Sequence, residues 1–100
     1  MTDKPSAELS FRAATHVEVP FTGVSRSPFQ AAHQQYIAAL LHDGSLLAAG
    51  ALGDGSGSIL LVVGAPQVAQ ILVEADPYWA AGVWGEPSLR EFLYASLPNP

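Results

Sequence analysis

A strict alternation of apolar and polar side chains near the N-terminus constrains the fold of this chain more than any other feature. Between residues 9 and 21 most odd positions are apolar, whereas Arg12, His16 and Glu18 stand at even positions. Successive side chains of a strand point to opposite faces, so this pattern predicts a strand with one face against a core. Pro20 predicts that the ordered ladder stops near it or that the strand lies at an edge.

Helical spacing appears in two further segments. Apolar residues three and four positions apart predict a helix from Ser27-Pro28 to Asp43-Gly44, with the serine as N-cap. A second helix is predicted over residues 66–76, where the following Pro77 disfavours its continuation. Asp76 is then placed to cap a short third helix that this proline opens.

The remaining segments complete the predicted fold. Strands are expected at 46–51, 58–63 and 87–95, and Asp54-Gly55 predicts a hairpin turn between the first two of these. The order strand–helix–strand–strand–helix–strand predicts an α+β protein with a ferredoxin-like βαββαβ fold and an antiparallel sheet. At 100 residues the whole chain, 1–100, is expected to be one domain, with residues 1–8 as a loose lead-in.

Composition excludes several classes of protein. Hydrophobic residues make up 49% of the chain and charged residues 13%, which excludes an intrinsically disordered protein. So few charges leave an apolar face to be covered, and we expect a homodimer. Nine acidic against four basic residues give a net charge of −5. Because the arginines are also scattered, nucleic acid and anionic membranes are not expected as partners.

Cysteine usage bounds the chemistry, and hydropathy bounds the compartment. The chain has no cysteine, so disulfides, thiolate nucleophiles and cysteine-based metal sites are excluded. The first ten residues lack the apolar stretch of a signal peptide. The longest apolar run, 59–63, is far shorter than the roughly 20 residues of a membrane helix. A cytoplasmic protein is the default expectation.

Two residues stand out as candidates for acid/base chemistry. His33 falls on the apolar stripe of the first helix, where it is either a partly buried structural histidine or a general base. Asp76 either caps the short helix alone or also accepts a hydrogen bond from His33, which would fix the tautomer of the imidazole. Spacing along the chain cannot bring the two together, so the fold decides between these alternatives.

Other polar and aromatic residues carry weaker signals. His16 and Glu18 share one strand face and, with His42, raise the question of a metal, but nothing fixes a third ligand and no metal site is expected. The glycine-rich run 53–57 lacks the Walker lysine and predicts a turn. Three aromatic residues are either core or interface side chains or the wall of a substrate site: Tyr78, Trp79 and Trp84.

The segment Asp76 to Val83, DPYWAAGV, at its distance from the helical His33, resembles the YCII-related family, as do Gly44 and the run at 46–50. The resemblance covers roughly residues 29–93. It implies a small ferredoxin-like protein that pairs as a dimeric α/β barrel. It also implies that His33 and Asp76 form a catalytic pair. Characterised members include a dehydrochlorinase that acts on a chlorinated hydroxyhydroquinone.

The chain departs from this family's pattern at two positions. An arginine often stands three residues before the histidine, where this chain has Gln30, and a proline often follows the glycine at position 50, where it has Ala51. The missing arginine bears on the binding of an anionic substrate. Arg12 or Arg26 could take its role.

Together these features predict a cofactor-independent lyase or isomerase that uses His33 and Asp76 on a small cyclic or phenolic substrate. Tyr36, one turn from His33, either packs in the core or donates to a developing enolate. The residues expected to bind substrate are Tyr36, Arg12, Tyr78 and Trp79. One alternative is a non-catalytic small-molecule-binding or assembly module. A weaker one, a cofactor-free monooxygenase, rests only on the shared barrel.

Overall fold

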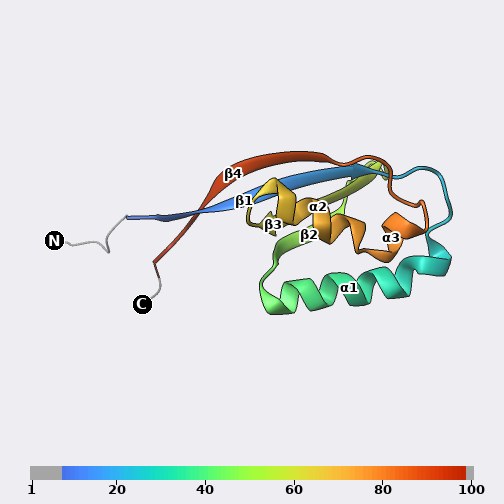
Figure 1. The fold of residues 1–100 in the computed structure, drawn as a ribbon, viewed down its shortest axis with the longest axis horizontal. Coiled ribbons are helices and arrows are strands. Elements are labelled where there is room, and N and C mark those ends of the chain that lie inside the picture. The colour runs from blue at the N-terminus through green and yellow to red at the C-terminus, as the bar shows by residue number, and fades with distance from the viewer. Residues whose placement is uncertain (1–7, 99–100) are drawn as a thin grey trace.

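The computed structural model describes residues 8–98, so residues 1–7 of the expected lead-in lie outside the described part of the chain. The elements along the chain are β1 (Ser10–Pro20), the 3-10 helix η1 (Ser27–Phe29), α1 (Gln30–Asp43), β2 (Leu46–Ala51), β3 (Gly57–Val63), α2 (Pro66–Glu74), α3 (Pro77–Ala80) and β4 (Ser88–Ser96). The strands form an antiparallel sheet in the order β2-β3-β1-β4 (Figure 1). This is the α+β ferredoxin-like arrangement that the element order predicts.

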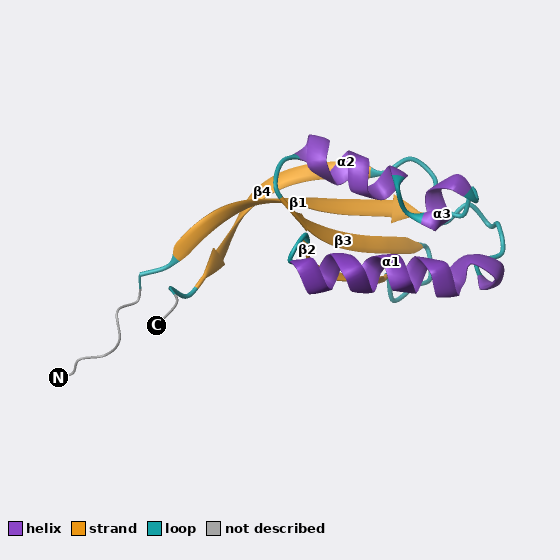
Figure 2. Ribbon diagram, turned by 60° about the horizontal axis from the view of Figure 1, so that its bottom comes forward, coloured by secondary structure: helices purple, strands orange, loops and turns teal. Residues whose placement is uncertain are grey.

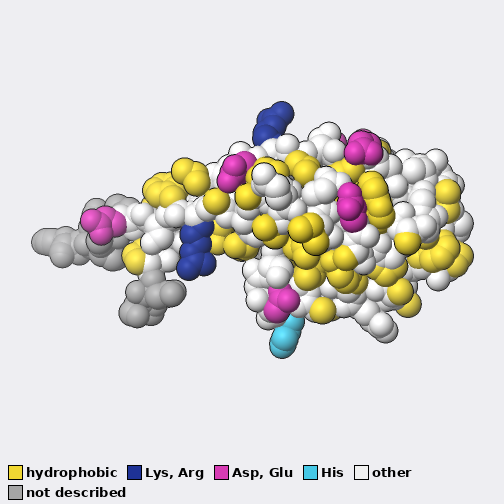
Figure 3. Space-filling view, in the orientation of Figure 1, with side chains coloured by type: hydrophobic (Ala, Val, Ile, Leu, Met, Phe, Trp, Pro, Cys, Tyr) yellow, Lys and Arg dark blue, Asp and Glu magenta, His cyan; other side chains and the backbone are white. Residues whose placement is uncertain are grey.

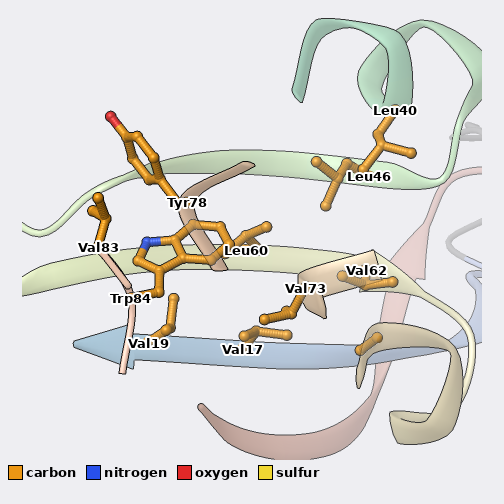
Figure 4. Packing of buried hydrophobic residues seen from close by; sticks show 11 residues of the cluster. Val17, Val19, Leu40, Leu46, Leu60, Val62, Val73, Tyr78, Val83 and Trp84 are labelled. Atoms are coloured by element: carbon orange, nitrogen blue, oxygen red, sulfur yellow. The ribbon is translucent and has the colours of Figure 1, made fainter. Parts of the chain in front are cut away.

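The helices lie on one face of the sheet (Figure 2), and the hydrophobic core fills the layer between the helices and the sheet. Val17 and Val19 of β1, with Leu60 and Val62 of β3, point into this layer and are almost completely buried (Figure 4). The odd positions in the C-terminal half of β1 therefore face the core, as the alternation predicts. The other members of the core are Leu40, Leu46, Ala69, Val73, Tyr78, Val83 and Trp84.

The N-terminal part of β1 does not face a core, contrary to the prediction. β1 pairs with β3 only from Ala14 onward but pairs with β4 from Ser10, so a two-stranded arm projects beyond the helices (Figures 1 and 2). Phe11 and Leu93 on this arm are 59% and 67% exposed. The alternation thus continues along β1 past the point where the helices cover the sheet.

Local sequence determines where α1 begins and ends. Ser27 is not an N-cap: Ser27 and Pro28 lie inside η1, the residue before it is Arg26, and no side chain caps η1 or α1. That prediction was wrong because the chain enters α1 through a tight 3-10 turn, which begins one residue earlier than an α-helical start would. At the other end Gly44 has a φ of 85°, the left-handed conformation that ends a helix and that glycine adopts without strain.

Backbone contacts fasten the end of β1 to the segment that follows α3. The N–H of Thr22 donates to the carbonyl oxygen of Val83 at 2.9 Å, and an isolated antiparallel bridge joins Phe21 to Trp84. Trp84 is consequently held beside the sheet, at the opposite end of the core from Leu40 and Leu46 (Figure 4).

The face of the sheet away from the helices carries no helix from residues 8–98. His16, Glu18, Arg90 and Phe92 lie around a hollow on β1 and β4 at this face. In the orientation of Figure 1, hydrophobic side chains gather across the body of the molecule and charged ones are few and scattered (Figure 3). Within the described residues, no helix combines the length and the apolar character needed to span a membrane.

Candidate active site

Asp76 stands at the N-terminus of α3 with an extended backbone, at φ −75° and ψ 138°. Its Oδ1 accepts a hydrogen bond from the backbone N–H of Tyr78 at 2.8 Å. This is the capping role that the Asp-Pro sequence predicts. Asp76 is only 1% exposed, so its carboxylate depends on partners within the protein.

His33 of α1 is the second partner of this carboxylate. Its Nδ1 lies 2.9 Å from both Oδ1 and Oδ2 of Asp76. An ionised carboxylate can only accept, so Nδ1 carries a proton and donates it. In the neutral imidazole Nε2 then holds the free lone pair, and no described residue forms a hydrogen bond with it. The fold therefore brings together the two residues that the sequence singles out.

Two aromatic rings restrict the orientation of the His33 imidazole. The ring of Tyr78 lies parallel to it, with centroids 3.8 Å apart and planes 4° from parallel. Trp84 meets the imidazole edge-on at a centroid distance of 5.4 Å and an angle of 85°. Because Nδ1 is tied to Asp76 and one ring face is covered, Nε2 points in a fixed direction.

His33 lines a cavity of about 350 Å³ between α1, the strands β2 and β3, and the segment that contains α3. Tyr78 and Trp84 also line it and belong to the hydrophobic core as well, so their placement fits both interpretations of these aromatic residues. Most of the remaining lining is apolar. The other polar side chains that reach the cavity are Arg26, Gln30, Gln34 and Ser58.

Arg26 brings a positive charge to this cavity. Its guanidinium lies 4.2 Å from the centroid of the Phe21 ring. No described carboxylate lies within ion-pair distance of it. Burial raises the pKa of Tyr78, the charge of Arg26 opposes that rise, and the charge of Asp76 adds to it. The phenol of Tyr78 is therefore protonated at neutral pH and able to donate a hydrogen bond.

The other residues assigned to substrate binding lie outside the lining of this cavity. Arg12 lies on the projecting arm of β1, where β3 no longer pairs with it. Trp79 packs against the core. Tyr36 donates its hydroxyl hydrogen to the carbonyl oxygen of Leu72 at 2.7 Å, so that hydrogen is already engaged. Tyr36 and Trp79 are near the pair along the chain, but neither side chain lines the cavity.

The three residues considered as metal ligands do not come together at one place. His16 and Glu18 lie at the hollow on the outer face of the sheet, and His42 lies in the last turn of α1. Across residues 8–98, no three histidine, aspartate or glutamate side chains gather closely enough to hold a metal ion. The chemistry that the described residues offer is centred on His33 and Asp76.

The sequence analysis did not assign three polar residues of the cavity lining to the site: Gln30, Gln34 and Ser58. Gln30, Gln34, Ile37 and Leu41 follow one another at spacings of three and four, which marks a common helix face. That spacing was a usable signal for the two glutamines. Ser58 offers no comparable signal, because a serine at the start of a strand next to a glycine-rich turn looks like part of the turn.

The sequence matches no protein-family model and no curated protein. Among solved structures, the fold is similar to that of 5-chloro-2-hydroxyhydroquinone dehydrochlorinase from Burkholderia phenoliruptrix AC1100, solved in complex with 2,5-dihydroxybenzoquinone. The TM-score is 0.65 at 20% sequence identity, and the match covers 77% of this chain and 90% of that chain. This likeness shows a shared fold, the one that the resemblance to the YCII-related family implies.

Proposed function

We propose that the protein is a cofactor-independent lyase or isomerase of the YCII-related family, with His33 as general base and Asp76 as its orienting partner. The observation that carries the proposal is the 2.9 Å contact between Nδ1 of His33 and a buried carboxylate, on a histidine that lines a cavity. That contact holds a proton on Nδ1 and leaves Nε2 to accept one from a substrate.

The proposed step is a proton transfer. Nε2 of His33 takes a proton from a carbon or hydroxyl of the substrate, and the electron pair left behind delocalises onto a ring oxygen. The charge of Asp76 stabilises the imidazolium that forms. A lyase then expels a leaving group with its bonding electrons, whereas an isomerase returns the proton to another substrate atom. General-base catalysis of this kind contributes about 10²–10⁴-fold.

The cavity favours a small planar substrate. Its volume of about 350 Å³ lies at the lower end of the range for small-molecule sites. Tyr78 and Trp84 supply aromatic surface for a ring, and Arg26 supplies a positive charge for an oxyanion. The dehydrochlorinase of the same fold, named for a chlorinated hydroxyhydroquinone and solved with a dihydroxybenzoquinone, supports a phenolic or quinone ligand.

A non-catalytic binding module of the same fold is the second candidate. One observation favours it: both members of the pair also have structural partners, since His33 stacks on Tyr78 and Asp76 caps α3. Such a module would bind 2,5-dihydroxybenzoquinone in the cavity and leave a chlorinated substrate unchanged. Binding and turnover therefore separate the two functions.

The test is incubation with 5-chloro-2-hydroxyhydroquinone without oxygen, with chloride release as the readout. We expect release above the protein-free rate, and a loss of on the order of a hundredfold or more in His33→Asn. His42→Asn is the matched control, because His42 lies exposed on the same helix and outside the cavity. Binding of the quinone without any chloride release supports the binding module. Neither binding nor release contradicts both functions.

We further propose that a second copy of the chain covers the outer face of the sheet. Glu18 and Arg90 lie at this face with the apolar Phe92, and a two-fold axis can place the acidic residue of each copy near the basic residue of the other. Light scattering at micromolar concentration should then report a dimer, and Phe92→Asp should shift it to a monomer. A monomeric unsubstituted protein would contradict this assembly.

A further inference from the structure

Ser58 is a buried hydroxyl in the same cavity as His33. It pairs with Val19 of β1, whose side chain points into the core, so the side chain of Ser58 faces the helices as well. Only 7% of the residue is exposed, and it lines the cavity together with His33 and Trp84. The residue is thus more than nine-tenths buried and lines the same cavity as the candidate base.

Trp84 determines which role this hydroxyl plays. The indole Nε1 lies 3.3 Å from Oγ of Ser58. An indole N–H is a donor only, so Ser58 accepts in this contact and its own hydrogen is left to donate elsewhere. No described residue accepts that hydrogen. Because a buried donor without an acceptor is unfavourable, the acceptor has to come from the cavity, either as water or as a bound molecule that replaces it.

We infer that Ser58 donates its hydroxyl hydrogen to the substrate oxygen on which negative charge develops when His33 removes a proton. This inference rests on the proposed function and deepens it. It restricts the substrate to molecules that carry an oxygen conjugated to the reacting atom, such as a phenol, an enol or a quinone. A donor fixed before the reaction stabilises that charge without reorganising.

Trp84 contacts both His33 and Ser58. Its ring meets the His33 imidazole edge-on at 5.4 Å, while its N–H reaches Ser58 at 3.3 Å. One buried side chain therefore contacts both the base and the donor. Donation from the indole also polarises the serine hydroxyl and strengthens it as a donor. The backbone bridge from Phe21 keeps Trp84 in place.

The experiment measures binding of 2,5-dihydroxybenzoquinone by absorbance titration and its carbonyl stretch by infrared difference spectroscopy. We expect Ser58→Ala to weaken binding on the order of tenfold to a hundredfold, the effect of losing a hydrogen bond to a charged group. The carbonyl band of the bound quinone should move to higher wavenumber. Ser88→Ala, at the hollow on the outer face, is the matched control and should bind as the unsubstituted protein does.

Repeating the substitution in a second variant separates its effect on binding from its effect on the stability of the fold. Ser58→Ala leaves the buried indole N–H without its acceptor, which destabilises the fold. The same substitution is therefore repeated in Trp84→Phe, where neither partner of that hydrogen bond remains. Ser58→Ala should weaken binding in this background too, by a smaller factor, because the indole no longer polarises the serine hydroxyl.

The outcomes separate the inference from the proposed function. Weaker binding and a shifted carbonyl band in both backgrounds support Ser58 as the donor. Binding within about twofold and an unmoved band overturn this inference and leave the proposed function standing. An unsubstituted protein that does not bind the quinone overturns both.

Discussion

The imidazole of His33 lies flat against the phenol ring of Tyr78, with centroids 3.8 Å apart and planes 4° from parallel. The backbone N–H of the same tyrosine donates to Asp76 at 2.8 Å. Tyr78 therefore supports both members of the pair, one through its ring and the other through its backbone. This explains how α3, a helix of four residues, holds the candidate site in place.

His33→Asn separates the chemistry of the histidine from its structural role. His33→Ala removes the ring stack and one donor to the buried carboxylate of Asp76, and should cost about 1–3 kcal/mol of unfolding free energy. An asparagine amide can still donate to Asp76 but cannot act as a base near neutral pH. Urea denaturation should place His33→Asn between His33→Ala and the unsubstituted protein. Chloride release should be lost in both variants, and an active His33→Asn protein would show that the base lies elsewhere.

Asp76→Asn tests the orienting role of the carboxylate. The amide oxygen of asparagine keeps the cap by accepting from the N–H of Tyr78, which turns the amide nitrogen toward Nδ1 of His33. That nitrogen donates, so it favours the tautomer with the proton on Nε2, which can no longer accept one. We expect quinone binding within about threefold and chloride release slowed on the order of a hundredfold or more.

Nitrogen NMR of the imidazole provides an independent check on Asp76→Asn. In the unsubstituted protein the proton should be on Nδ1, and in the variant it should move to Nε2. A variant that keeps the proton on Nδ1 and still loses activity would assign Asp76 an electrostatic role alone.

Local signals in the sequence predicted the order and type of most elements. Gly44 ends α1 in a left-handed conformation and Asp76 caps α3, as glycine and an Asp-Pro pair indicate. Phe11 shows where periodicity stops being informative. Alternation marks which side chains share a face, but it does not say whether another layer covers that face, and Phe11 lies where none does.

The candidate site was only partly predictable, for a related reason. His33 and Asp76 could be named from their residue types and their places on helices, whereas their contact depends on how α1 packs beside α3. Arg12 was assigned to substrate binding by its charge alone, and the charge of a residue does not indicate where in the fold its side chain lies. Ser58 became visible only through its contact with Trp84, which spans 26 residues.

Tyr36→Phe should change how stability depends on alkaline pH. Burial, and after it the charges of Asp76 and Asp43, raise the pKa of Tyr36 above its usual value of about 10. The folded state thus holds this proton more tightly than the unfolded state does. Its contribution to stability is complete below the unfolded pKa and is lost as the pH rises through the folded pKa. The phenylalanine variant should lose less stability above pH ~10.

At neutral pH the same variant should be slightly less stable. It lacks the hydrogen bond from the Tyr36 hydroxyl to the carbonyl oxygen of Leu72, which is worth about 1 kcal/mol. Urea midpoints measured between neutral and strongly alkaline pH give both effects. Parallel stability curves for the two proteins would mean that Tyr36 does not titrate in this way.

Arg26→Gln tests whether the charge at the cavity selects an anionic ligand. The guanidinium of Arg26 lies over Phe21, with no described carboxylate within ion-pair distance. 2,5-Dihydroxybenzoquinone is an acid that ionises readily, so the substitution should weaken its binding by about tenfold. Hydroquinone, uncharged at neutral pH, should bind equally to both proteins. High salt should weaken binding of the anion to the unsubstituted protein more than to the variant.

Arg12→Gln is the control that distinguishes the two arginines. Arg12 lies on the projecting arm and does not line the cavity, so its loss should leave the affinity for both probes unchanged. Arg26→Gln should in addition raise the pKa of Tyr78, because it removes the positive charge that opposes the effect of burial. If Arg12→Gln weakens binding of the anion and Arg26→Gln does not, the anion binds at the arm and the assignment to the cavity is wrong.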